Sequence, residues 1–404
     1  MSTPVIATPS SLAMARSPLF ITGRNNALPN DTLNYMSLAL RIYSGVRTGT
    51  GTNNYSLSKN YSINEVINFE ISDLVRSEFY HDFSIWNDIG YVQSPQGEVL
   101  WVRPAGSWTY SDAGTFPVTA PFATGATAAY LSTDGWATMT NITPTAVSQL
   151  VLATSRDRQV LPNNYEVLAL NNSVLNDLIE IEIAWNNGDA DTFYTSVSGT
   201  TPPDPTSNDT QDQVIYAGVG PANLQNNAWI DNTIKPSAHD IGDYYDVILK
   251  DSGGDTIASV RYYLVCEPKY TPYQIAFINR FGVADFITFF KRSDERGTFT
   301  QDNYQKSIYN DGFTTPSLEV GKYNSFNVNS RNSLTLNTGF VEQDYDETIK
   351  DILMSEYVAV LENSQWIAVQ PERGSIEYQK HVNQKLINYT LTFTYAFDER
   401  SLVR

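Results

Sequence analysis

Short runs in which apolar and polar residues strictly alternate constrain this chain more than any other feature of its sequence. In residues 178–185, LIEIEIAW, every second position from Ile179 to Trp185 is apolar, and residues 35–43, YMSLALRIY, alternate in the same way. A period of two is typical of a β-strand with one buried face. Because almost no helical period precedes residue 340, the pattern predicts a mainly β chain of tandem antiparallel, immunoglobulin-like β-sandwiches.

Turn residues divide these runs into hairpins. Residues 244–250 and 256–265 flank DSGGD, in which two glycines offer the positive φ values of a tight reversal. Residues 273–278 and 286–290 form a second pair of apolar segments. Pro272 suits the start of a strand because it donates no hydrogen bond, and Gly282 suits a turn. We therefore predict a hairpin that opens the C-terminal domain.

Two helices are expected. Residues 68–76 pass from a strand into a short helix with Ser72 or Asp73 as its N-cap. Near the C-terminus, apolar residues recur at helical spacing from Tyr345 to Leu353, behind Asp344. This pattern predicts one amphipathic helix of roughly ten residues, followed by a β-rich region.

The length of 404 residues indicates two or three domains. We predict an extended arm over residues 1–18, β-sandwich domains over 19–130 and 131–269, and a β-rich assembly domain with one helix over 270–404. The proline-containing arm either straps a neighbouring subunit or is disordered. Residues 198–212, SGTTPPDPTSNDTQD, predict a projecting loop.

Charged residues make up only 17% of the chain, against about 25% in ordinary soluble domains. A surface of Asn, Thr, Ser and Tyr loses little hydration against a partner, so the composition favours extensive protein contacts. The net charge of −18 repels phosphate and anionic lipid. It argues against sequence-specific nucleic-acid binding but is compatible with passive passage of DNA. Without a signal-peptide pattern or a long apolar window, we expect folding in the cytoplasm and no membrane insertion.

No constellation of catalytic residues is evident. The single Cys266 excludes an intramolecular disulfide and is expected to be a buried, inert thiol. His81, His239 and His381 lack metal-ligand spacing and are expected to be structural or surface residues. The acidic run from Asn186 to Asp191 favours a hairpin turn over a calcium site. We predict that the chain is not an enzyme and has no catalytic, metal-binding or cofactor-binding residues and no cofactor; a hydrolase with paired carboxylates stays open as an alternative.

Several stretches resemble β-rich virion proteins of tailed bacteriophages, in particular tail or neck proteins of the ring, adaptor or baseplate type. They are FEIS at residues 69–72, FINRFG at 277–282, FITF at 286–289, LINYT at 386–390 and YAFD at 395–398. The resemblance implies a structural protein that forms a ring-like homo-oligomer around the DNA path. Its expected partners are copies of itself and other tail, neck or portal-adjacent proteins. The expected location is the virion, after synthesis and assembly in the host cytoplasm.

An alternative function is binding of a receptor or glycan for host attachment. Tryptophan rings on loops stack on sugar faces, and Trp101, Trp108 and Trp136 are candidates beside the loop at 198–212. The opposing interpretation places these tryptophans in the core.

The predicted hairpin carries basic residues near its ends. Arg280 and Phe281 lie between its apolar segments, and Lys291, Arg292 and Arg296 follow the second one. The intervening acids indicate a solvated turn rather than a phosphate site. We therefore predict that these five residues make contacts between subunits, and that charge reversal at Arg280 weakens the oligomer.

Overall fold

We describe the protein from a computed structural model. The described residues are 5–7, 12–24, 32–44, 53–60, 66–81, 92–93, 97–111, 118–121, 129–137, 149–172, 179–194, 214–228, 230–266, 269–306, 321–374 and 387–400. The chain divides into two compact units built from interleaved segments. The first contains Met1–Cys266, Ala276–Ile287 and Asp344–Ser355, and the second contains Glu267–Ile275, Thr288–Gln343 and Glu356–Arg404.

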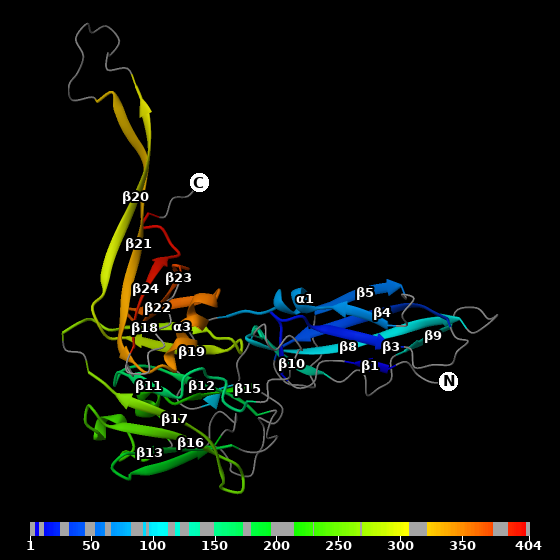
Figure 1. The fold of residues 1–404 in the computed structure, drawn as a ribbon, viewed down its shortest axis with the longest axis horizontal. Helices are drawn as coiled ribbons and strands as arrows, with labels where there is room; N and C mark the ends of the chain where they lie inside the picture. Colours follow the sequence, from blue (N-terminus) through cyan, green and yellow to red (C-terminus); the bar gives the residue numbers. More distant parts are fainter. Residues whose placement is uncertain are drawn as a thin grey trace. The chain divides into compact units, whose positions relative to one another are not determined.

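Two sheets form the first sandwich of unit 1 (Figure 1). The smaller has the order β1 (Val5–Ala7), β3 (Phe20–Arg24), β6 (Val66–Glu70). The larger has the order β2 (Ala13–Met14), β10 (Tyr130–Thr133), β8 (Val99–Ser111), β4 (Thr32–Tyr43), β5 (Asn53–Asn60), with β9 (Val118–Pro121) also paired to β8. Alternate residues of β4 from Met36 to Ile42 are buried, and they pack with Ile21 and Phe69 of the smaller sheet. The alternation seen in the sequence therefore marks the buried face.

The second sandwich of unit 1 has a five-stranded and a three-stranded sheet. The order of the first is β11 (Asp157–Val160), β17 (Thr256–Leu264), β16 (Tyr244–Lys250), β13 (Glu180–Trp185), β14 (Ala190–Tyr194). That of the second is β12 (Val167–Asn171), β15 (Val214–Gly218), β7 (Val92–Gln93). The short α1 (Ser72–Arg76), α2 (Pro221–Asn226) and η4 (Pro236–Ala238) also belong to unit 1. Trp185 closes the core, where its indole N–H donates to the carbonyl of Ile234 at 2.7 Å.

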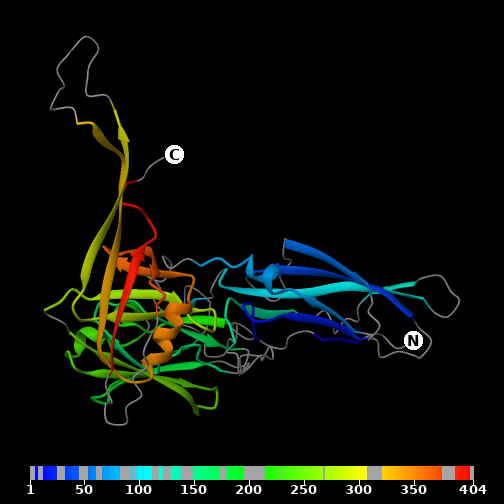
Figure 2. The ribbon, with the colours of Figure 1, turned by 45° about the horizontal axis from the view of Figure 1, so that its top comes forward.

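A seven-stranded sheet contains the remaining described strands. Its order is β19 (Ala284–Phe289), β18 (Tyr273–Ile278), β22 (Val358–Glu362), β23 (Gln365–Pro371), β24 (Ile387–Tyr395), β21 (Tyr323–Val341), β20 (Asp294–Gln305). The helix α3 (Tyr345–Met354) lies between β21 and β22 in the sequence. Within the second unit, β20 and β21 run together well beyond β24 and β23 (Figure 2).

The predicted fold class is confirmed: the chain is mainly β, with tandem antiparallel sandwiches and few helices. The predicted hairpins exist as β16 with β17 and β18 with β19, and the ten-residue α3 begins after Asp344 as expected. The acidic run after Trp185 is the turn between β13 and β14, with Gly188 at φ 96°.

Some local predictions were wrong. The N-cap of α1 is Ile71 without a side-chain cap, because Ser72 lies inside the helix and its hydroxyl donates to Glu70 at 3.3 Å. Cys266 is exposed, since β17 ends two residues before it at Leu264. Both glycines of the turn after β16 were predicted to have a positive φ, but only Gly254 does, at 83°. The carboxylate of Asp251 stabilises the turn instead, because it accepts the backbone N–H groups of Gly253 and Asp255.

The predicted N-terminal arm also differs from the structure in the residues that can be compared. Val5–Ala7 pairs with β3 of the same chain, and Leu12, Ala13 and Ala15 are buried in the first sandwich. The small side chains of Ala13 and Ala15 fit into the core, although the proline-containing composition of residues 1–18 is typical of an extended segment. The loop at 198–212 and His381 lie outside the described residues, and the domain boundaries stay predictions.

Unit 1 also buries charge. Arg158 of β11 donates to Asp285 of β19 at 2.5 Å and to Glu166 at 3.4 Å, and all three side chains are at least 95% buried. The guanidinium of Arg158 therefore forms ion pairs with two carboxylates. Burial raises the pKa of Glu166 to about 7, although Arg158 lowers it and Asp285 raises it further.

Glu166→Gln should change how stability depends on pH. Because the pKa of Glu166 is higher in the folded than in the unfolded chain, its protonation favours the folded state below pH 4.5, and this contribution is lost as the pH rises through 7. The unfolding free energy of the variant relative to wild type should therefore rise by about 2 to 3 kcal/mol between pH 5 and pH 8. Denaturant titrations at several pH values measure this difference; one that does not change with pH would contradict the assignment.

Candidate assembly surfaces

The turn between β18 and β19 holds Arg280 and Phe281, the first two predicted contact residues. Asn279, fully buried, shapes this turn: its amide N–H donates to the carbonyl of Leu152 at 2.8 Å, and its side-chain oxygen accepts from the backbone N–H of Phe281 at 3.0 Å. Gly282 has φ 76°, and a Cβ there would lie 2.3 Å from the backbone nitrogen of Gly135. The turn therefore needs glycine for two reasons, its conformation and the close approach of a second backbone.

Arg280 forms ion pairs with α3 inside its own chain. Its Nε lies 3.1 Å from Asp351, and its guanidinium also donates to Glu347. Since Glu347 and Asp351 are four residues apart, one helix face presents both carboxylates to the same cation. Asp351 also accepts from the backbone N–H of Arg280 at 3.1 Å. Burial raises the pKa of Asp351 to about 6 despite these partners.

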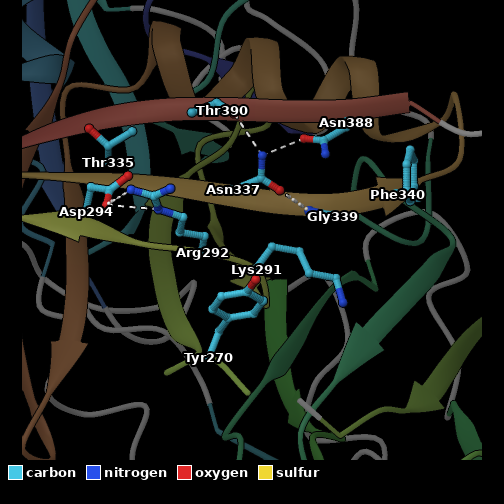
Figure 3. A pocket seen from close by; sticks show the side chains of 10 residues that line it. All are labelled: Tyr270, Lys291, Arg292, Asp294, Thr335, Asn337, Gly339, Phe340, Asn388 and Thr390. Carbon is cyan, nitrogen blue, oxygen red and sulfur yellow. Dashed lines mark hydrogen bonds and ion pairs between the residues drawn. The ribbon is translucent and has the colours of Figure 1, made fainter. Parts of the chain in front are cut away.

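Lys291 and Arg292 lie beside a groove in the second unit (Figure 3). Arg292 donates to Asp294 at 2.9 Å, and both side chains are more than half exposed. The stem of Lys291 lies over Gly339, where an added Cβ would come within 2.9 Å of the lysine Cγ. Asn337 forms the floor by donating to Asn388 and Thr390 at 2.7 and 2.8 Å. The groove, of about 420 Å³, is a mixed-charge surface, which agrees with a solvated turn better than with a phosphate site.

Arg296 belongs to β20, a strand that the sequence did not reveal. All twelve residues of β20 are exposed, although they pair with β21 along the whole strand. Arg296, Thr298 and Thr300 line one face and, with residues of β21, β23 and β24, border a polar groove of about 820 Å³. On this face the hydroxyls of Thr335 and Thr392 lie 3.1 Å apart, and Arg331 donates to Asp398 at 3.1 Å.

Large aromatic side chains are exposed along the same two strands. The exposed fractions are 76% for Phe299, 46% for Tyr304, 67% for Tyr323 and 50% for Phe326. The rings of Tyr304 and Phe326 pack edge to face with centroids 5.7 Å apart. We call the segments 297–305 and 323–332 the β20–β21 ribbon. Its Thr and aromatic residues favour a strand, but no period of two reveals it, because almost all of its residues are exposed or half-buried.

The histidines and tryptophans can now be placed. His81 is buried, with Nε2 3.3 Å from Asp134, and His239 stacks on Trp185 with ring centroids 3.6 Å apart. Trp101 is 3% exposed and belongs to the core, whereas Trp136 is half-buried. Trp101 therefore cannot stack on a glycan; the side chain of Trp108 lies outside the described residues. No group of three His, Cys, Asp or Glu residues that could hold a metal ion occurs in the described part of the chain.

Comparisons with known proteins add little. No family model and no curated protein matches this chain. One solved structure, from work entitled "Structural basis for Dscam isoform specificity", aligns with 83% of this chain and 74% of its own at 8% identity, with a TM-score of 0.17. This likeness is too weak to support any statement about function. Among the described residues, no helix is long and apolar enough to span a membrane.

Arg280→Ala should destabilise the monomer itself. The change leaves the Asp351 carboxylate, whose side chain is 2% exposed, without its cation. We expect a loss of about 3 kcal/mol, the lower end for breaking a buried pair because Arg280 is itself partly exposed. Thermal or urea denaturation measures it, and Asp351→Asn in the Arg280→Ala background should recover part of the loss.

The matched control is Glu347→Gln, which removes the exposed carboxylate that shares Arg280. It should cost less than about 1 kcal/mol. Equal losses in the two single variants would contradict the separate parts assigned to Asp351 and Glu347. Sedimentation of the same variants measures subunit association separately from the stability of the monomer, and so tests whether Arg280 also contributes to an oligomer.

Proposed function

We propose that this chain is a structural component of a tailed-bacteriophage virion, part of the tail or neck, and that it assembles as a ring-like homo-oligomer around the path of the DNA. The observation that carries the proposal is the β20–β21 ribbon. A two-stranded ribbon is marginally stable in water by itself, and this one also leaves four large aromatic side chains between 46% and 76% exposed. Contact with further chains would bury these rings and support the ribbon.

The composition agrees with this role. Few charged side chains have to lose hydration at a subunit contact, and the exposed polar residues of the ribbon are mostly Asn, Ser, Thr and Gln. The net charge of −18 keeps DNA from adhering, as a conduit requires. Stretches such as FINRFG, which resemble phage tail and neck proteins, support the same proposal.

Sedimentation velocity and negative-stain imaging of the purified chain over a range of concentrations test the oligomer. We expect closed rings, and mass spectrometry of purified virions should detect the chain in stoichiometric amounts. A monomer at every concentration, together with absence from virions, would refute the proposal.

A shortened chain supplies the matched variant. Residues 301–328 are replaced by Asn-Gly, so that a two-residue turn joins Thr300 to Asn329, its partner in the β20–β21 register. The variant keeps the pairing of β21 with β24 and should have an unchanged melting temperature, but it should form no rings. If rings still form, subunit contacts lie elsewhere on the chain and the ribbon does not carry the assembly.

A further inference from the structure

β20 ends the seven-stranded sheet and leaves one backbone edge open. The carbonyl oxygen of Ser330 accepts the backbone N–H of Glu399 at 2.8 Å, so it points to the side of β21 opposite β20. Phe299 faces Ser330 in the register, so its own N–H and C=O point away from β21. Beyond the bulge after Thr300, Lys306 N–H donates to the carbonyl of Lys322, which gives the same alternation. The odd-numbered residues of β20 therefore present their backbone groups at the open edge.

The side chains of β20 match those of a second, antiparallel copy of the same strand. If two β20 strands pair antiparallel about a twofold axis at Phe299, each residue faces the one equally far on the other side of position 299. Arg296 then faces Asp302, Thr298 faces Thr300, and Phe299 faces Phe299 of the second chain. Opposite charges and aromatic pairs directly across two strands both stabilise the pairing. Among the described residues Arg296 forms no ion pair with its own chain, so its charge is available.

We infer that the open edge of β20 pairs with β20 of a second copy of this chain, antiparallel and centred on Phe299. The ladder joins two ribbons into a four-stranded sheet and covers the phenyl rings that each chain exposes. This inference does not depend on the virion role. An isologous twofold contact closes on itself and is distinct from the head-to-tail contact that closes a ring.

Other antiparallel registers match less well. Only registers that place odd-numbered residues opposite odd-numbered ones align the outward backbone groups. A centre at Thr298 would put Asp294 opposite Asp302, and a centre at Gln301 would leave Arg296 without a facing residue in β20, because its counterpart, Lys306, follows the strand. Like charges directly opposite each other destabilise strand pairing. A centre at Thr300 brings Asp294 opposite Lys306, which follows the strand, but within β20 it faces Arg296 with Tyr304 and Thr298 with Asp302, so it loses the two direct Arg–Asp pairs.

A charge swap tests the pairing in the full chain. In Arg296→Asp, the new aspartate faces Asp302 of the other chain at two symmetric places. The dissociation constant of the dimer should therefore rise about tenfold or more. Asp302→Arg should do the same by opposing two arginines. The double variant restores opposite charges and should return the constant to within about threefold of wild type. Sedimentation equilibrium measures association, and circular dichroism confirms folding, which these exposed substitutions leave intact.

A disulfide experiment tests the centre of the ladder. Cys266, which is exposed, is first changed to Ser, so that a single new cysteine is present. Phe299→Cys lies on the axis, where facing Cα atoms are about 5.5 Å apart, within reach of a disulfide. Mild oxidation should therefore link this variant into a covalent dimer, while the matched Thr300→Cys should stay uncrosslinked.

The outcomes separate the inference from the proposed function. Rescue by the double swap together with crosslinking at 299 supports the ladder, whether or not rings form. Crosslinking at 300 instead, or no rescue by the double variant, overturns it. Rings that persist in Arg296→Asp while the twofold dimer is lost would show that ring contacts do not use the β20 edge, and the shortened chain then tests whether they use the rest of the ribbon.

Discussion

The buried pair between Asp285 and Arg158 is the interaction on which unit 1 most depends. Asp285 lies in β19, yet its partners come from other parts of the chain: Arg158 at 2.5 Å, Thr154 at 3.3 Å and Asn279 at 3.2 Å. A buried carboxylate without such partners would be strongly destabilising. These bonds hold Ala276–Ile287 in unit 1, although the preceding and following residues belong to unit 2.

Asn279 extends this network to the turn that carries Arg280. With one side chain it binds Asp285, the carbonyl of Leu152 and the amide of Phe281. Arg280 is thereby held where it meets Asp351 of α3. The residue that resembled an assembly contact in the sequence has a definite intramolecular partner, and its part between subunits stays a prediction. Lys291, Arg292 and Arg296 are all exposed, whereas Arg280 is partly buried.

The sequence predicted those strands and helices that bury one face. β4, β13 and α3 each alternate or repeat with the period of their structure, because solvent and core lie on opposite sides. β20 and the outer part of β21 have solvent on both faces, so their polar residues show no period. Arg158, Glu166 and Asp285 were missed for the opposite reason: charged residues in a sequence suggest solvent, and only tertiary contacts show that they neutralise one another in the core. The contact candidates Lys291, Arg292 and Arg296 were chosen by their charge; the sequence did not show that Lys291 and Arg292 precede a long edge strand or that Arg296 lies within it.

An open strand edge twelve residues long is a hazard, since any extended chain can add to it. β20 limits this hazard through its own sequence. Asp294, Glu295, Arg296 and Asp302 place charges along the edge, so a partner strand must match a specific charge order. The reverse of β20 itself provides that order with Phe299 at the centre. In such a dimer the open β20 edges of both chains pair with each other, so neither edge is left for a third strand. The residues that permit this contact therefore also prevent the open-ended addition of further chains.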